Sequence, residues 1–220
     1  TYKKIYKKHY KNIGKSFDDD SALFTKDREK IFTLVGSKAN LKITDKEDLK
    51  IFRSIQMTKI YYGIGFDIHK LIKGRKLFLG GVKIPSALGL KGHSDADPVL
   101  HALIDGLLGA CKLGNIGILF SDKNKKYKNI RSTILLKKTI NKIKSKNFLI
   151  NNIDINVITQ KPKISVYSNK MKNVICKICG INLNQINIKG KTTEKLGIIG
   201  REKAIAAEAI VSVIKYDERI

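Results

Sequence analysis

The sequence has little that would support a disulfide framework, a membrane span or a covalent nucleophile. Its 220 residues include three cysteines, three prolines and no tryptophan. Cys176 and Cys179 have Cys-x-x-Cys spacing, but no second pair completes a four-ligand zinc site, and Cys111 stands alone. No apolar run is long enough for a transmembrane span, and no Ser/His/Asp arrangement is evident. We therefore expect buried thiols in a reducing compartment and no membrane partner.

Acidic residues are scarce, with 19 against 44 basic residues and a net charge of +25. Residues 58–220 alone carry 30 of the basic and 11 of the acidic side chains, so the basicity belongs to the main body of the chain. The electrostatic field of so much positive charge attracts polyanions, including nucleic acid and phosphorylated small molecules. The lysines follow no single helix and no aromatic stacking platform accompanies them. We therefore predict no specific nucleic-acid partner.

Histidine is also rare, and its distribution is uneven. Three of the four histidines lie in one window, residues 65–101. Four of the eleven acidic residues of the segment 58–220 lie in or beside the same window: Asp67, Asp95, Asp97 and Asp105. This concentration of titratable side chains marks the window as the candidate site.

The window begins with the extended segment Gly65-Phe66-Asp67-Ile68-His69. Side chains alternate along a strand, so Asp67 and His69 project from one face. The same alternation predicts that Phe66 and Ile68 point into the core. This strand would present a carboxylate and an imidazole side by side.

From Ser94 onward the apolar residues follow the three-and-four spacing of a helix. Asp97, His101 and Asp105 lie four residues apart along a different stripe of that helix. Ser94 or Asp95 can cap its start. The helix would therefore bring a further imidazole to the strand.

A three-ligand metal site follows from this arrangement. Asp67, His69 and His101 supply the ligand count of a catalytic zinc with an open fourth position. Asp105 could orient a ligand histidine through its other ring nitrogen. The alternative is that these histidines satisfy core hydrogen bonds or lie on the surface.

The remaining segments alternate between strand and helix patterns. They predict an α/β (α+β) sandwich, in which helices cover a mixed sheet of about four strands. The segment 113–122 is too glycine-rich for a helix, and 204–214 suits either a helix or a strand. The other expected strands are 76–84, 150–159 and 184–189, and the expected helices are 94–111, 129–146 and 165–179.

Residues 1–57 are predicted to form a basic extension to a domain at 58–220. No secretory h-region is visible in the extension. Either it is the remnant of an organelle-targeting leader or it is a spacer without consequence.

A second cluster of potentially functional residues lies near the end of the domain, from Lys189 to Gly197 and at Gly200-Arg201. Hydroxyls, lysines and backbone amides directly after a strand can hold phosphate oxygens. A carboxylate among them, Glu194, can hold a hard divalent cation that bridges those oxygens.

Together these stretches resemble the 2-C-methyl-D-erythritol 2,4-cyclodiphosphate synthase family of the non-mevalonate isoprenoid pathway. The resemblance covers about residues 58–218. It rests on five ordered motifs: Gly65-Phe66-Asp67-Ile68-His69, Gly80-Gly81-Val82-Lys83-Ile84-Pro85, His93-Ser94-Asp95-x-Asp97-x-x-x-His101, Leu113-Gly114-x-Ile116-Gly117, and Thr192-Thr193-Glu194-Lys195-Leu196-Gly197-x-x-Gly200-Arg201.

The resemblance implies a phosphorus–oxygen lyase that works as a homotrimer, with active sites at the subunit interfaces. It implies zinc on Asp67, His69 and His101, and magnesium or manganese on Glu194. The substrate would be 4-diphosphocytidyl-2-C-methyl-D-erythritol 2-phosphate. Its 2-phosphate oxygen would attack the β-phosphorus of its own diphosphate, closing the ring and releasing CMP.

The resemblance also implies roles for further residues. Catalytic, phosphate-contacting roles fall on His93, Ser94 and Thr192. A methylerythritol-binding role falls on Asn115, Ile116, Gly117, Phe120 and Asp122. A cytidine-binding role falls on Pro162, Lys163, Ile164, Lys191, Thr193 and Glu194, and positions near the trimer axis match Ile198 and Arg201.

The chain departs from the family pattern at Asn115, where the family usually has aspartate. The contact to the substrate diol would lose its charge there, although an amide oxygen can still accept a hydrogen bond. The pathway and the basic extension favour a plastid-type, apicoplast-like organelle, or the cytoplasm if the extension is not a leader.

Two other functions compete with the synthase. One is a basic nucleic-acid-binding protein with a structural zinc, and the other is a zinc phosphohydrolase that uses metal-bound water.

Overall fold

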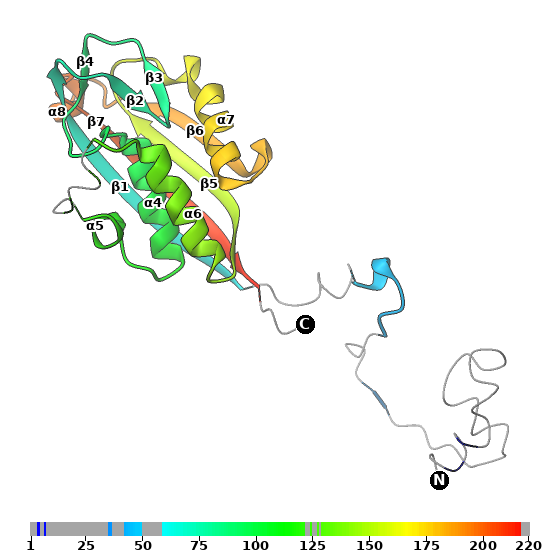
Figure 1. Cartoon of the computed structure of the whole chain (residues 1–220). Coiled ribbons are helices and arrows are strands. Elements are labelled where there is room, and N and C mark those ends of the chain that lie inside the picture. Colours follow the sequence, from blue (N-terminus) through cyan, green and yellow to red (C-terminus); the bar gives the residue numbers. More distant parts are fainter. Residues whose placement is uncertain are drawn as a thin grey trace. The chain divides into compact units, whose positions relative to one another are not determined.

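The computed structural model describes residues 42–49, 59–121 and 129–216, and six single residues: Lys4, Lys7, Val35, Gly36, Asn124 and Tyr127. The chain divides into two compact units, Thr1–Gln56 and Met57–Ile220 (Figure 1). In the first unit Asp45 begins a helical turn, because its carboxylate accepts the backbone N–H of Glu47 at 2.7 Å and of Asp48 at 2.9 Å. Most of residues 1–57, for which the sequence predicts a leader remnant or a spacer, lie outside the described residues.

The second unit is built on a five-stranded mixed sheet with the order β4-β1-β7-β5-β6. β5 and β6 run parallel, and the other neighbours are antiparallel. The strands are β1 (Ile60–Lys73), β4 (Leu88–Leu90), β5 (Phe148–Ile158), β6 (Ile186–Lys191) and β7 (Ala204–Lys215). The segment 204–214, ambiguous from its composition, is a strand, and its place between β1 and β5 puts it at the centre of the sheet.

A separate two-stranded hairpin replaces the single strand expected over 76–84. It consists of β2 (Leu77–Leu79) and β3 (Val82–Ile84). Gly80 and Gly81, at φ 58° and 79°, form the turn between them. Because positive φ strains other residues, the two glycines set the position of this turn.

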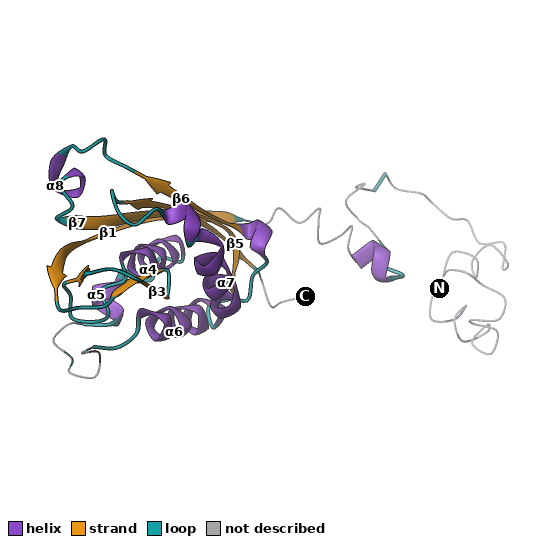
Figure 2. Ribbon diagram, turned by 90° about the horizontal axis from the view of Figure 1, so that it is seen from above, coloured by secondary structure: helices purple, strands orange, loops and turns teal. Residues whose placement is uncertain are grey.

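Three main helices cover one face of the sheet (Figure 2). They are α4 (Pro98–Ala110), α6 (Ser132–Lys144) and α7 (Ser168–Cys179). Shorter helices are α5 (Ile116–Leu119), η3 (Ile164–Val166), η4 (Leu183–Gln185) and α8 (Gly197–Gly200). The predicted α/β sandwich is confirmed, but α5 begins where glycine content argued against a helix. In the described part of the chain no helix is both long and apolar enough to cross a membrane.

The core lies between the sheet and the helices, and α4 is its centre. Leu100, Leu103, Ile104 and Leu107 of α4 are completely buried. Cys111, Cys176 and Cys179 are free and buried, as predicted. Burial raises the pKa of the Cys111 and Cys179 thiols to about 12. These cysteines therefore behave as small apolar side chains rather than as nucleophiles.

The backbone of α4 lies directly on β1, where two glycines leave room for it. A Cβ atom on Gly65 would come within 2.0 Å of the Ala102 carbonyl oxygen and 2.6 Å of the Gly106 nitrogen. A Cβ atom on Gly63 would come within 2.1 Å of the Gly106 carbonyl oxygen. The glycines thus set the distance at which the helix approaches the strand.

We expect Gly65→Ala to lower the free energy of unfolding by about 1–3 kcal/mol or more, because the helix backbone must move away. Urea unfolding measures this loss. Gly109→Ala on α4 is the matched control, since nothing lies within 4 Å of its added Cβ. The control should gain up to about 1 kcal/mol from helix propensity. Equal stability of the two variants would contradict the close approach.

The opposite face of the sheet carries apolar side chains that none of the described helices covers. Phe66 is 54% exposed and Ile68 is 38% exposed on β1. The prediction that these two side chains enter the core is wrong. Glycine and the site residues occupy the core-facing positions of β1, so its large apolar residues point outward.

Candidate metal centre

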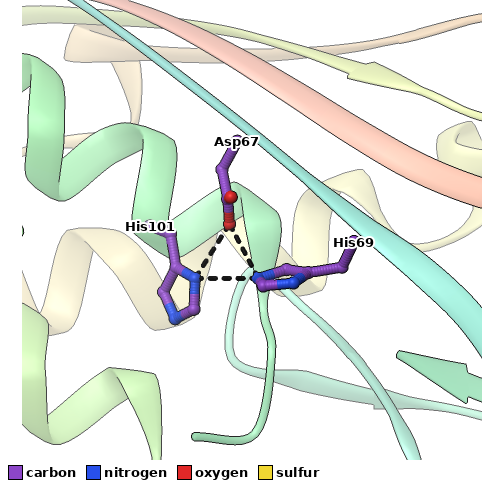
Figure 3. A group of neighbouring side chains, drawn as sticks. All are labelled: Asp67, His69 and His101. Atoms are coloured by element: carbon purple, nitrogen blue, oxygen red, sulfur yellow. Dashed lines mark hydrogen bonds and ion pairs between the residues drawn. The ribbon is translucent and has the colours of Figure 1, made fainter. Parts of the chain in front are cut away.

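Asp67, His69 and His101 meet at one point (Figure 3). Asp67 Oδ2 lies 2.8 Å from His101 Nδ1 and 2.9 Å from His69 Nε2. The two histidine nitrogens lie 3.2 Å apart. The strand β1 supplies the first two residues and the helix α4 supplies the third, as the sequence predicted.

This group fits a divalent metal ion. Donors at the corners of a tetrahedron around zinc lie about 3.3 Å apart when the metal–ligand bonds are about 2.0–2.1 Å. The separations found here, 2.8, 2.9 and 3.2 Å, are within about half an ångström of that value. Two imidazoles and a carboxylate are also a donor set that zinc favours. The geometry supports a divalent metal site without selecting the metal.

Charge pairing shifts the pKa values of two members of the group. Burial alone would raise the pKa of Asp67, but hydrogen bonds and charge from His101 and His69 outweigh it and hold this pKa far below its ordinary value. Burial likewise opposes charge on His101, but the hydrogen bond and charge of Asp67 raise the pKa of His101 above 6.5. The metal-free site therefore favours a protonated His101 beside an ionised Asp67.

This pairing predicts opposite pH trends with and without metal. In the metal-free chain, His101 contributes stability that is complete below pH 6.5 and is lost as the pH rises through its raised pKa. Asp67 contributes stability above pH 3.8 that is lost as the pH falls through its lowered pKa. Metal binding requires a neutral His101, so zinc should instead add more stability as the pH rises.

Urea unfolding with a chelator and with zinc, at about pH 5.5 and about pH 8.5, measures both trends. His101→Ala serves as the control and should remove both of them. The same pH trend in both conditions would contradict the pairing.

Asp97, rather than Ser94 or Asp95, caps α4. Its completely buried carboxylate accepts the backbone N–H groups of Val99 at 3.1 Å and Leu100 at 3.2 Å. It also accepts those of Gly80 at 2.9 Å and Gly81 at 2.6 Å. One side chain therefore fixes the start of the helix that carries His101 and ties it to the β2–β3 turn.

Asp105 does not orient a histidine. Its Oδ1 accepts the backbone N–H of Ile116 at 2.6 Å. Asn115 caps α5 by accepting the N–H of Ile118 at 3.0 Å. Asp105 thus holds the loop at 115–117, for which the resemblance implies substrate binding, against the helix that carries His101.

Ser94 contacts the far side of the His101 ring, because its Oγ lies 3.1 Å from His101 Nε2. Its neighbour His93 is held in the same loop, since its carbonyl accepts the N–H of Asn129 at 2.8 Å. Phe120 is buried directly after α5. Asp122 lies outside the described residues.

A second group of predicted site residues gathers at the ends of β5 and β6. The N–H of Thr159 donates to the carbonyl of Lys191 at 2.9 Å. With its amide oxygen facing the next loop, Gln160 accepts the N–H groups of Lys195 at 3.1 Å and Thr193 at 3.3 Å. The hydroxyl of Thr192 donates to the carboxylate of Glu194. These bonds bring the segments 159–164 and 191–195 together, while Ile198 lies in α8 and Arg201 directly after it.

The two groups lie at the same end of the sheet but on different strands. Ile68 of β1 pairs with Ala206 of β7, which pairs with Ile158 of β5, which in turn pairs with Lys191 of β6. Three strand spacings, about 14 Å, therefore separate the two groups within the chain. Glu194 is not part of the group around Asp67.

Sequence reasoning missed two residues behind the metal group. Ser132 Oγ lies 2.8 Å from His101 Nε2, and Arg131 pairs with Asp95 at 2.8 Å. Arg131 is the N-cap residue and Ser132 the first residue of the amphipathic helix α6, and their spacing from His101 carries no pattern that could have revealed the contact.

Comparison with known proteins gives consistent results. Residues 60–214 match the model of the YgbB family. The chain is 56% identical over 216 residues to the bifunctional enzyme IspD/IspF of Pelagibacter ubique, covering 98% of this chain but 57% of that enzyme. It is 52% identical over 151 residues to the 2-C-methyl-D-erythritol 2,4-cyclodiphosphate synthase of Caldicellulosiruptor bescii, covering 69% of this chain and 96% of that enzyme.

Among solved structures, the CDP complex of IspF from Plasmodium falciparum is similar, with a TM-score of 0.64 and 40% identity. That match covers 74% of this chain and all of the other. The sheet-and-helix architecture is therefore that of IspF structures.

The prediction of a plastid-type organelle is wrong. The bacterial bifunctional enzymes match 92% or more of the chain, so the matches extend into residues 1–57. Because part of residues 1–57 aligns with bacterial enzymes, the extension does not support an organelle location.

Proposed function

The chain belongs to the YgbB family, and on this premise we propose that it converts 4-diphosphocytidyl-2-C-methyl-D-erythritol 2-phosphate to 2-C-methyl-D-erythritol 2,4-cyclodiphosphate and CMP. The reaction is an intramolecular phosphoryl transfer, which makes the enzyme a phosphorus–oxygen lyase. The observation that carries the proposal is the convergence of Asp67, His69 and His101 within a domain of this family.

The reaction brings two phosphates of like charge together, so its barrier is largely electrostatic and positional. Zinc on Asp67, His69 and His101, and magnesium or manganese on Glu194, would when bound neutralise the phosphate oxygens and align them. The residues of the chain act by holding the substrate. Ser94, whose Oγ lies 3.1 Å from His101 Nε2, and its neighbour His93 would hold the phosphates, and no protein nucleophile is needed.

The loops at 159–164 and 191–195 would hold the cytidine and diphosphate portions. Thr192 and Thr193 present hydroxyls, and Lys163 and Lys191 add positive charge. The loop at 115–117, with Phe120 and Asp122, would receive the methylerythritol portion. Asn115 already uses its side-chain oxygen to cap α5, so its contact with the diol would rest on the remaining hydrogen-bonding capacity of its amide.

The enzyme would work as a homotrimer with shared active sites. The uncovered sheet face carries Tyr62, Ile64, Phe66 and Ile210, each more than half exposed. A contiguous apolar surface of this kind is typical of an interface. The two site groups lie about three strand spacings apart in one copy, too far to act on the same phosphates. In a trimer, a second copy could place its 191–195 loop against the metal group of the first.

A mass-spectrometric assay tests the proposed function. Purified chain with zinc and magnesium should release CMP and the cyclic diphosphate from the CDP-linked substrate. In ¹⁸O-labelled water the product should carry no label, because the attacking oxygen belongs to the substrate. Labelled, uncyclised product would instead indicate the zinc phosphohydrolase. Intact substrate together with salt-sensitive binding to unrelated duplexes would indicate the nucleic-acid-binding protein.

A further inference from the structure

A row of hydrogen bonds continues from the metal group into the protein on the far side of His101. His101 Nε2, which points away from Asp67, lies 2.8 Å from Ser132 Oγ. Ser132 Oγ in turn lies 2.5 Å from Asp95 Oδ1. Asp95 Oδ2 accepts the Nε–H of Arg131 at 2.8 Å. Ser132, Asp95 and Arg131 thus form a relay behind the metal ligand.

The direction of these hydrogen bonds follows from the chemistry of the groups. A carboxylate paired with a guanidinium only accepts, so the single hydroxyl hydrogen of Ser132 goes to Asp95. Ser132 Oγ can then only accept from His101, which places the imidazole hydrogen on Nε2. In the neutral imidazole that can bind a metal ion, the nitrogen without a hydrogen is then Nδ1, which faces Asp67 and His69. The relay therefore selects the tautomer that presents a lone pair to a metal ion.

The relay is held firmly in place. Ser132 is completely buried and Asp95 is 8% exposed. Asp95 Oδ1 also accepts the backbone N–H of Ser132 at 3.1 Å, so it anchors the first residue of α6. Arg131 donates to the carbonyl of Gly81 at 3.1 Å and lies over the ring of Phe78, 3.9 Å from its centroid.

Ser94 has a different place in the network. Its Oγ is the second neighbour of His101 Nε2, at 3.1 Å, and it accepts the N–H of Ala96 at 3.2 Å. Among the described residues no carboxylate accepts the hydroxyl hydrogen of Ser94, so this hydroxyl can contact a ligand. Of the two serine hydroxyls near His101 Nε2, only that of Ser132 donates to a carboxylate, the one of Asp95.

We propose that Ser132 and Asp95 are positioning residues that fix the tautomer and orientation of His101 and so set the affinity of the site for a divalent metal. Arg131 supports them by holding Asp95. The inference rests on the metal site of the proposed function but concerns metal binding, which can be measured without substrate. Outer-sphere partners of this kind typically change metal affinity by about 10–100-fold when removed.

Zinc affinity of the metal-stripped full chain, measured by competition with a chromophoric chelator, tests the proposal. Ser132→Ala should weaken zinc binding by about 10–100-fold. Ser132→Thr, which keeps the hydroxyl, should stay within a few-fold of the unchanged chain. Thr139→Val is the matched control, because Thr139 is a completely buried hydroxyl of the same helix that donates only to the Leu135 carbonyl, at 3.1 Å.

Asp95→Asn gives a second measure of the relay. Its amide cannot accept at once from the Arg131 Nε–H on one side and from the Ser132 N–H and hydroxyl on the other. We expect weakened zinc binding and an altered visible spectrum of the cobalt(II)-loaded chain, whose bands report ligand geometry. Thr139→Val should leave the cobalt spectrum unchanged.

The outcomes separate this inference from the proposed function. Equal zinc affinity in Ser132→Ala and Thr139→Val, with both folded by circular dichroism, would overturn the relay while leaving the metal site intact. Ser132→Thr as weak as Ser132→Ala would also overturn it, because the hydroxyl would then not be the active group. An unchanged chain that binds no zinc would overturn the relay and the metal site together.

Discussion

Asp67→Ala and His101→Ala chains should release CMP from the CDP-linked substrate more than about 10³-fold more slowly than the unchanged chain. Removal of a single stabilising donor typically costs about 10²–10³-fold. Either substitution removes a ligand of the metal site as well as a direct contact, so the loss should exceed that range. Release of CMP under single-turnover conditions, with zinc and magnesium present, measures the effect.

Asp154→Ala is the matched control for the first of these variants. Asp154 is a carboxylate on β5 that pairs with Lys189 at 2.5 Å, away from the metal group. Its removal should leave CMP release within a few-fold of the unchanged rate. Asp67→Ala activity within about tenfold of the control, a difference of about 1.4 kcal/mol in the barrier, would contradict a catalytic metal at this site.

Co-expression of two inactive chains, His101→Ala and Glu194→Ala, should restore activity. If each active site takes His101 from one copy and Glu194 from its neighbour, some interfaces in a mixed trimer pair an intact His101 with an intact Glu194. Random mixing gives about one quarter of such sites in a cyclic assembly. The mixture should therefore recover up to about a quarter of the unchanged activity, whereas each variant alone remains inactive.

The matched control is co-expression of His101→Ala with Asp67→Ala. Both substitutions fall in the same metal group, so no interface of that mixture contains an intact site and activity should not return. Purification with two different affinity tags removes unmixed assemblies and should raise the recovery to about a third, because each mixed cyclic trimer has one intact site among its three. Absence of recovery in a verified His101→Ala and Glu194→Ala mixture would contradict sharing of the site between copies.

The metal group was predictable because its geometry is local. Alternation along β1 places Asp67 and His69 on one face whatever lies around the strand, and the spacing of α4 places His101 on a fixed stripe. The mixed sheet and its covering helices followed from the same periodicities. For the loop at 191–195, the hydroxyls, lysines and carboxylate suggested phosphate and cation binding. The cytidine-binding role predicted for the loop at 159–164 came from the resemblance alone.

The errors arose where a residue's environment depends on distant parts of the chain. Phe66 and Ile68 are as apolar as core residues, but the core side of β1 is occupied by glycine because the backbone of α4 lies against it. Asp97 rather than Ser94 or Asp95 caps the helix because the β2–β3 turn supplies it with further N–H groups. No local pattern in the sequence reports either contact.

The role of Ser132 at the site was likewise not predictable from the local sequence. Its role depends on hydrogen bonds to His101 and Asp95, which are 31 and 37 residues away in the chain. A serine at the start of a helix is ordinarily read as a local feature. Only the packing of α6 against α4 brings its hydroxyl to the metal ligand.

Anomalous diffraction from crystals of the zinc-loaded chain, recorded on both sides of the zinc absorption edge, tests the central claim most directly. The account predicts one zinc peak per subunit bonded to a carboxylate oxygen of Asp67, His69 Nε2 and His101 Nδ1, at about 2.0–2.2 Å from each. Zinc bound elsewhere, or bound to His101 through Nε2, would contradict the account.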